Sequence, residues 1–517
     1  MGLARRTRIV GAPIQPVGAD RWVPAGLSLA CAEVRISVRP QRVLVVVIPM
    51  IVVIGVVVGF VTGAFGSMNG PGISPTGSGS SSASLQPSVG MKSPTPAAAT
   101  PTATASPARL PSPVLAPASS GPPPDASKLA ARINAVHVKN LKGQYSGAVA
   151  DLGSGQVLFA HNAKTGFIPA STMKLLTSAT ALSVLGPNHT FRTSVVSTKA
   201  RHIVLVGGGD PYLTKKTSSG EYPRRASLAD LARLTATRLK ADKITKVSLG
   251  YDSSLFPGPA WNPVWPDAYG DQVTRTSALW VDEGRVNGGS PGPRWRDPAM
   301  NAAATFAAAL RKRGIAVTSV APARAPRSAA RIASVRSMPL ERIVERLLLA
   351  SDNDAAETLL RQAAVGTGRP GTAADGVKAV KATLSKLGAW DASTRISDGS
   401  GLARQTKVSA DTMVKVLRLA AQDQHPELRA VVTGLAVAGV EGSLRTRFFD
   451  DQSLAGRGVV RGKTGTLRKV HTLAGMVRTA DGSVLAFAFL INNPKNDYAA
   501  TVWLDRVTTA IGTCGCR

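Results

Sequence analysis

The chain has 517 residues, and 62 lysines and arginines against 31 acidic residues give it a net charge of +31. Such a charge favours anionic partners, but no nucleic-acid-binding module is recognisable. The six histidines are scattered without the spacing of metal ligands, so we expect no metal site, and cysteine use is sparse.

The N-terminal region predicts a membrane anchor. Residues 43–65 form an apolar run without a charge, long enough to cross a bilayer. The positive-inside rule places residues 1–42 in the cytoplasm and everything after the run outside the cell. We therefore expect a single-pass protein of the cell membrane with an extracytoplasmic catalytic domain. The alternative is secretion after cleavage of a signal peptide near Thr62-Gly-Ala64. The arginines before the run, opposed only by Asp20 and Glu33, are Arg5, Arg6, Arg8, Arg21, Arg35, Arg39 and Arg42.

Residues 66–126 are dominated by Pro, Ala, Ser, Thr and Gly. Such a segment cannot bury enough apolar surface to fold by itself, and proline keeps it extended. We predict a disordered, semi-stiff linker. The remaining chain, residues 127–517, is ample for one large or two moderate cores.

The next informative segment runs from Phe167 to Leu182, in which Pro169 suits the start of a predicted helix. It contains Ser171-Thr-Met-Lys174. Residues three apart lie on one face of a helix, so Lys174 can reach the Ser171 hydroxyl. A serine is a weak nucleophile until a base takes its proton, and a lysine serves as that base only if burial or a nearby cation lowers its pKa.

Residues 191–335 alternate between predicted strands and helices. Gly207-Gly-Gly-Asp210 lies among them and lacks the ending of a phosphate-binding P-loop, so we interpret it as a turn. The predicted strands are Phe191–Ser197, His202–Val206 and Ile315–Val320, and the predicted helices are Ala226–Leu239 and Asn301–Arg313.

Two further strings follow in residues 336–517. Ser351-Asp-Asn353 lies in a predicted loop between helices Leu340–Leu349 and Asp354–Ala364. Lys463-Thr-Gly465 lies on a predicted strand, Val459–Leu467. Strands His471–Thr479 and Ser483–Asn492 follow it and flank the hairpin signal Asp481-Gly482. Near the C-terminus, Cys514 and Cys516 either close a small ring or pair between chains.

In this order the three strings read S-x-x-K, S-D-N and K-T-G. From Leu129 onward the chain resembles a class C low-molecular-mass penicillin-binding protein, of the D-alanyl-D-alanine carboxypeptidase/endopeptidase family. The resemblance implies an α/β (α+β) fold of the penicillin-binding/β-lactamase-like transpeptidase type, with an antiparallel sheet flanked by helices. Since 180 residues separate Ser351 from Ser171 (351 − 171), we expect an inserted smaller domain at 191–335 between catalytic parts at 127–190 and 336–517. Supporting strings are Leu205–Pro211, Ser277–Glu283, Asp398–Leu402 and Gly462–Leu467.

The resemblance also implies roles. Ser171 is the acylated nucleophile and Lys174 its base, while Ser351, helped by Lys463, passes a proton to the leaving amine. Asn353 binds the peptide of the substrate. The substrate-binding segment is Thr464, Gly465 and Thr466, with both threonines on the terminal carboxylate and Lys463 adding charge. The oxyanion hole is formed by the backbone N–H groups of Ser171 and Thr466.

The implied function is that of a serine-type D-Ala-D-Ala carboxypeptidase that acts on peptidoglycan stem peptides without a cofactor. β-Lactams are covalent inhibitors that trap the same serine, and anionic wall polymers are further candidate partners. The alternatives are a DD-endopeptidase, a β-lactamase and an inactive wall-binding module. We interpret Glu357 as an ordinary helix residue, so no glutamate for β-lactam deacylation is evident. Asp398-Gly-Ser-Gly is interpreted as a turn that fixes the chain near the site, without chemistry of its own.

Overall fold

The structure is a computed structural model, and it describes residues 121–517. The predicted cytoplasmic segment (1–42) and anchor (43–65) lie outside the described residues, as does most of the predicted linker (66–126). Between residues 121 and 517, no helix has the length and apolar character needed to span a bilayer.

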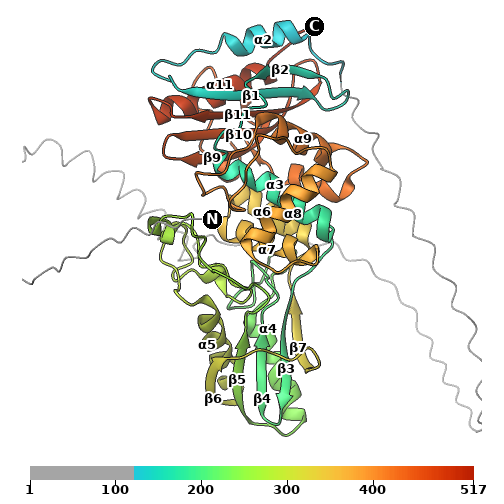
Figure 1. Ribbon diagram of the computed structural model, residues 1–517, viewed down its shortest axis with the longest axis vertical. Coiled ribbons are helices and arrows are strands. Elements are labelled where there is room, and N and C mark those ends of the chain that lie inside the picture. The colour runs from blue at the N-terminus through green and yellow to red at the C-terminus, as the bar shows by residue number, and fades with distance from the viewer. Residues whose placement is uncertain (1–120) are drawn as a thin grey trace, which may run out of the picture. The chain divides into compact units, whose positions relative to one another are not determined.

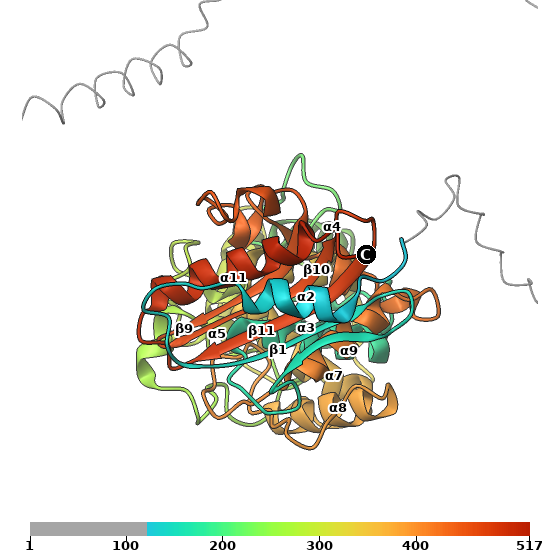
Figure 2. The same ribbon diagram turned by 90° about the horizontal axis from the view of Figure 1, so that it is seen from above.

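A six-stranded antiparallel sheet forms the centre of the catalytic part, with strand order β2-β1-β11-β10-β9-β8 (Figures 1 and 2). The hairpin predicted at Asp481-Gly482 joins β10 to β11, and Gly482 has the positive φ of +86° that such a turn favours. The strands are β1 (Gln144–Asp151), β2 (Val157–His161), β8 (Ala436–Val437), β9 (Val460–Leu467), β10 (Val470–Arg478) and β11 (Val484–Asn492).

Helices cover both faces of this sheet, and strand β11 shows why. Successive side chains on a strand point to opposite faces, and here both faces are apolar. The large residues Phe487 and Phe489 pack in the core with α2 (Ala126–Asn134) and α11 (Asp497–Gly512). The small residues Ala486 and Ala488 face the second helical layer and allow α9 to pack closely. That layer consists of α3 (Met173–Leu185), α6 (Leu340–Ala350), α7 (Asn353–Gly366), α8 (Ala373–Lys386), α9 (Ala410–Ala421) and the short α10 (Ala430–Thr433).

A second sheet of five strands lies in the sequence between α3 and α6, in the order β6-β5-β4-β3-β7. β3 pairs antiparallel with β4 and β7, whereas the β4-β5 and β5-β6 pairs are parallel and are each joined by a crossover helix. These helices, α4 (Leu228–Ala241) and α5 (Pro298–Arg311), share a separate core with the sheet. The strands are β3 (Arg192–Lys199), β4 (His202–Val206), β5 (Lys246–Asp252), β6 (Ala316–Pro322) and β7 (Ala330–Arg336).

The predicted fold class is confirmed: an antiparallel sheet flanked by helices, with a smaller α/β layer inserted in the sequence. The exact domain bounds stay predictions. Strands β5 and β7 were not predicted from the sequence. Helix α5 begins at Pro298, earlier than expected, because the Asp297 side chain accepts from the N–H of Met300 and proline suits the first turn. At the other end of the chain Cys514 and Cys516 form a disulfide, so the small ring is the pairing found.

Candidate active site

Ser171 lies where a short 3-10 turn (Ala170–Thr172) runs into helix α3. Ala170, the residue before it, has a φ of +47°, in the left-handed region that non-glycine residues rarely adopt. Strain of this kind persists where the surrounding structure enforces it. Here Thr472 of β10 donates a hydrogen bond to the Pro169 carbonyl at 2.8 Å. The turn therefore presents Ser171, half-buried, at the edge of the sheet.

Lys174 is fully buried, one helical turn after Ser171, as the spacing predicts. Its Nζ lies 2.8 Å from Ser171 Oγ, 2.7 Å from Asn353 Oδ1 and 2.8 Å from the Ser400 carbonyl oxygen. Burial lowers the pKa of Lys174 to about 8, although Asp398 and Asp352 act in the opposite direction. Of the two causes that the sequence analysis allowed, burial or a nearby cation, burial is the one that lowers this pKa in the structure.

The Asp398-Gly-Ser-Gly turn supplies the carbonyl group that holds Lys174. Its Gly399 and Ser400 N–H groups donate to the Glu357 carboxylate, at 2.9 and 2.7 Å, and Gly401 has a φ of +83°. Burial, reinforced by the charge of Asp398, raises the pKa of Glu357 to about 8. Glu357 is a helix residue, as interpreted, but it also shapes this turn. The signal that would have found it is an acidic residue on the apolar face of α7.

Ser351, at the end of α6, and Lys463, on β9, form a second hydrogen-bonded pair in the site. Ser351 ends α6 in the left-handed conformation, with a φ of +57°. The fully buried Lys463 donates from Nζ to Ser351 Oγ and to the Thr464 carbonyl oxygen, both at 2.8 Å. Burial first, and then the charge on Lys174, lower the pKa of Lys463 well below its usual value. The predicted loop between the helices is a short junction, since Asn353 already begins α7.

Strand β9 passes close to the nucleophile because residue 465 is a glycine. A Cβ at this position would lie 2.6 Å from the Pro169 carbonyl oxygen and 3.0 Å from the Ser171 nitrogen. Of its neighbours, Thr464 is buried and donates from Oγ1 to Ser443 Oγ at 2.7 Å, whereas Thr466 is exposed. The oxyanion hole at the N–H groups of Ser171 and Thr466 stays a prediction, which this close approach favours.

A cleft of about 890 Å³ is lined by four of the predicted site residues, Ser171, Ser351, Asn353 and Thr466, whereas Lys174, Lys463, Thr464 and Gly465 lie behind its surface. One wall comes from the segment between β5 and α5, and the Gln272 carbonyl there accepts a hydrogen bond from Asn353 Nδ2 at 3.0 Å. Asn353 thus links Lys174 to the inserted layer. The lining residues are Ser171, Pro266, Ala268, Tyr269, Asp271, Gln272, Ser290, Pro291, Ala350, Ser351, Asn353, Leu402, Arg404, Thr466, Leu467 and Arg468.

A buried ion-pair network fixes this wall to the Ser351–Asn353 junction. The Arg285 guanidinium lies 2.6 Å from a Glu283 oxygen, 2.9 Å from an Asp352 oxygen and 3.2 Å from an Asp354 oxygen. Burial and the charge of Asp352 raise the pKa of Glu283 to about 9. Sequence reasoning quoted Glu283 only as part of a family-like string and did not identify Arg285. No local pattern pairs residues so far apart.

Comparisons with known proteins agree with this geometry. The family model described as D-Ala-D-Ala carboxypeptidase 3 (S13) matches residues 128–292 and 288–507. A carboxypeptidase of Mycobacterium tuberculosis is 32% identical over 406 residues, which is 76% of this chain and 85% of that protein. Carboxypeptidase DacB of Mycolicibacterium smegmatis is 31% identical over 405 residues, 77% of this chain and 86% of that protein.

The fold is similar to that of penicillin binding protein 4 from Haemophilus influenzae, with a TM-score of 0.59 at 23% identity over 74% of this chain and 98% of that one. The same protein in complex with a β-lactam gives a TM-score of 0.55 at 22% identity, with the same coverage. With the three strings brought together in one cleft and the family model matching most of the described residues, the chain belongs to the D-Ala-D-Ala carboxypeptidase 3 (S13) family.

Proposed function

We propose that Ser171 carries the serine-type D-Ala-D-Ala carboxypeptidase activity of this family, through an acyl-enzyme formed on peptidoglycan stem peptides. The observation that supports this most directly is the chain of contacts from Ser171 Oγ through Lys174 Nζ to Asn353 Oδ1, beside the Lys463–Ser351 pair. Two lysines that burial holds at a low pKa are suited to moving protons near neutral pH.

In the proposed reaction, neutral Lys174 takes the proton from Ser171 as Oγ attacks the carbonyl carbon of the penultimate D-Ala. The N–H groups of Ser171 and Thr466 stabilise the oxyanion. When the C–N bond breaks, Ser351 passes a proton to the leaving amine of the terminal D-Ala, and Lys463 replenishes it. Water then cleaves the ester and releases the shortened peptide, as its hydroxyl bonds to the acyl carbon and its proton returns to Ser171 Oγ. The proton held by Lys174 passes to Lys463, which restores both lysines. When Ser171 opens a β-lactam ring, the leaving amine stays attached to the acyl group and cannot diffuse away. The acyl group therefore stays on the serine.

Covalent labelling tests this proposal. A fluorescent penicillin is expected to form one stable adduct on the full chain and none on Ser171→Ala, as followed by intact mass spectrometry. Ser178→Ala is a control, because Ser178 lies on α3, the helix that follows Ser171, but is fully buried and does not line the cleft. An adduct that survives in Ser171→Ala contradicts the assignment of the nucleophile. Rapid clearance from the wild type indicates a β-lactamase, and release of D-Ala from a pentapeptide or cleavage of a cross-linked dimer separates carboxypeptidase from endopeptidase.

The pH dependence of acylation reports on Lys174. Protonated Lys174 cannot accept the serine proton, and its pKa is about 8. The second-order rate constant for penicillin acylation is therefore expected to rise about tenfold per pH unit below pH 8 and to level off above it. Stopped-flow measurements of this rate constant at several pH values would locate the bend in the pH profile. Circular dichroism at the same pH values is the control for folding. A rate that stays flat across this range would exclude Lys174 as the base.

We further propose that residues 43–65 anchor the chain in the cell membrane and that the catalytic domain works outside it, among anionic wall polymers. The uncharged run and the arginines before it support this proposal. The full chain is expected to stay with membranes through an alkaline carbonate wash, and a variant lacking 43–65 is expected to be released. A wild-type chain found in the medium, with a new N-terminus near Ala64, would instead indicate a cleaved signal peptide.

A further inference from the structure

Four arginines line a cavity of about 520 Å³ away from the active-site cleft. Arg192 belongs to β3, Arg324 and Arg327 to the connection between β6 and β7, and Arg369 to the connection between α7 and α8. Gly207 and Gly208, from the glycine-rich stretch that the sequence analysis interpreted as a turn, also line it. We call this cavity the arginine pocket.

The positive charge of the arginine pocket is only partly neutralised, since one carboxylate lines it with four arginines. Within residues 121–517, none of its four arginines lies in an ion pair. The acidic residue in its lining, Asp252, already accepts from the N–H groups of Ser254 and Ala325, both at 2.8 Å. Asp252 therefore shapes the turn, and its single negative charge offsets one of the four arginines.

The adjacent strands add to this charge. Arg192 lies directly opposite Arg336 in the antiparallel β3-β7 pair, and Arg331 lies earlier on β7, opposite Val196. Like charges in facing positions destabilise a sheet. The charges of Arg336 and Arg331 lower the pKa of Arg192, which reports the positive potential at this edge. The repulsion between two like charges that face each other in this way can be relieved by an anion from outside.

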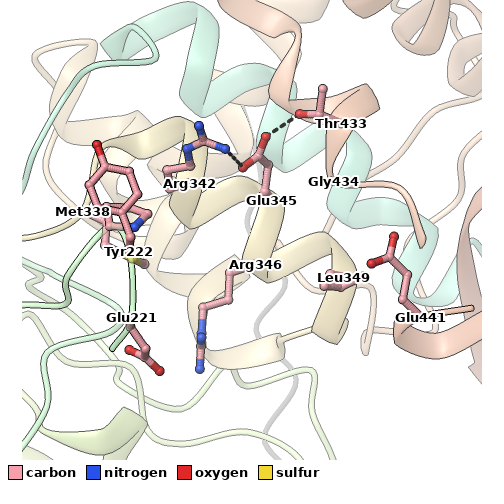
Figure 3. Close-up of a pocket in the computed structure, with 11 residues that line it drawn as sticks. Glu221, Tyr222, Met338, Arg342, Glu345, Arg346, Leu349, Thr433, Gly434 and Glu441 are labelled. Atoms are coloured by element: carbon pink, nitrogen blue, oxygen red, sulfur yellow. Dashed lines mark hydrogen bonds and ion pairs between the residues drawn. The ribbon is translucent and has the colours of Figure 1, made fainter. Parts of the chain in front are cut away.

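The cleft beside α6 differs, because three glutamates line it with two arginines, and Figure 3 shows the Arg342–Glu345 ion pair within it. There the Arg342 guanidinium lies 2.8 Å from Glu345, and Glu345 also accepts from the Thr433 hydroxyl at 2.5 Å. Glu221, in the same cleft, pairs with Arg225 at 2.7 Å. This cleft thus carries carboxylates beside its arginines, in contrast to the excess of arginine in the arginine pocket.

We propose that the arginine pocket binds the phosphodiester groups of a soluble anionic polymer. A guanidinium fork matches phosphate oxygens, and one arginine suffices for a single carboxylate, whereas several unpaired arginines from three segments suit a chain with a charge at each repeat. A lipid headgroup is less suited as the ligand. Proteins bind membrane surfaces partly through exposed apolar side chains, and none of the large ones found in residues 121–517 lines the pocket. This binding is separate from the acyl transfer at Ser171 and gives a location to the proposed contact with anionic polymers.

The test is binding of a fluorescent glycerol-phosphate oligomer to the full chain, measured by fluorescence anisotropy at several salt concentrations. The variant Arg192→Gln/Arg324→Gln/Arg369→Gln is expected to bind at least about tenfold more weakly, with a shallower salt dependence because fewer counterions are released. The matched control, Arg233→Gln/Arg395→Gln/Arg478→Gln, removes three exposed arginines elsewhere and is expected to change affinity less than about twofold. Penicillin labelling of each preparation separates a failure of this site from a failure of the proposed enzyme.

Several results would overturn the proposal. Equal losses in the two triple variants would mean that only total charge matters. If a polyglutamate of the same charge bound as tightly as the glycerol-phosphate oligomer, the pocket would have no preference for phosphate over carboxylate. Displacement by inorganic phosphate at the same phosphate concentration would indicate a single-ion site, and binding confined to anionic phospholipid vesicles would indicate a membrane surface. Selective loss in the pocket variant, with none of these, supports it.

Discussion

Lys174→Ala is expected to slow acylation of Ser171 by a penicillin about 10²- to 10⁴-fold, the range for loss of a general base. The reason is that Lys174 Nζ is 2.8 Å from Ser171 Oγ and its pKa of about 8 leaves a usable neutral fraction near neutral pH. Lys174→Arg is expected to be similarly slow, because a guanidinium keeps the positive charge but does not give up its proton. The measurement is the single-turnover rate of adduct formation, followed by mass spectrometry.

The arginine variant also serves as the control for charge. If Lys174 acted only by attracting the anionic substrate, Lys174→Arg would keep most of the rate, and that outcome would contradict the general-base role. Because Lys174 is fully buried, each variant also needs a thermal unfolding curve. A rate loss with an unchanged unfolding midpoint assigns the effect to chemistry rather than to folding.

Arg285→Met is expected to lower the free energy of unfolding by about 3–5 kcal/mol, because it leaves the buried Asp352 carboxylate without a cation and leaves Asp354 with only the 3.5 Å pair to Arg294. The side chain of Arg285 is 15% exposed, and those of Asp352 and Asp354 are 5% and 1% exposed. Acylation is also expected to slow, since Asp352 and Asn353 belong to the junction that follows Ser351. Denaturant unfolding, followed by tryptophan fluorescence, measures the stability, and penicillin labelling measures the rate.

Arg342→Met provides the matched control. Arg342 also lies 2.8 Å from a carboxylate, that of Glu345, but its side chain is 47% exposed. Exposed pairs of this kind contribute about 1 kcal/mol or less. Equal losses in the two variants would show that the Arg285 network does not depend on its burial, and would remove the reason for treating it as the support of the cleft wall.

The local part of this site could be predicted from the sequence because its signals are local. Ser171 and Lys174 are one helical turn apart, and Lys463-Thr-Gly465 lies on an apolar strand before a clear hairpin. The structure brings these predicted residues, with Ser351 and Asn353, around one cleft. The local sequence around these residues predicted the helix and the strand that carry them, and the three strings together indicated the family.

The supporting residues could not be predicted because their partners are distant in the sequence. Gln272 reaches Asn353 across 81 residues, and Ser400 reaches Lys174 across 226. Every residue has a backbone carbonyl group, so the residue type at position 400 does not indicate that the Ser400 carbonyl binds Lys174. Glu357 illustrates a third reason. The hydrogen bonds of a buried acid in a helix depend on the segment that packs against it, here the Asp398-Gly-Ser-Gly turn, whose position the sequence does not give.

The two ends of the described chain lie side by side. The N–H of Asp125 donates to the Cys516 carbonyl oxygen at 2.7 Å, and Lys128 Nζ donates to the carbonyl oxygen of Arg517. Adjacent ends of this kind are what circular permutation requires. A short peptide could join Arg517 to Gly121, and new termini could open at Gly368, in an exposed turn between α7 and α8. A reporter fused to Arg517 would likewise sit beside Asp125 rather than beside the cleft.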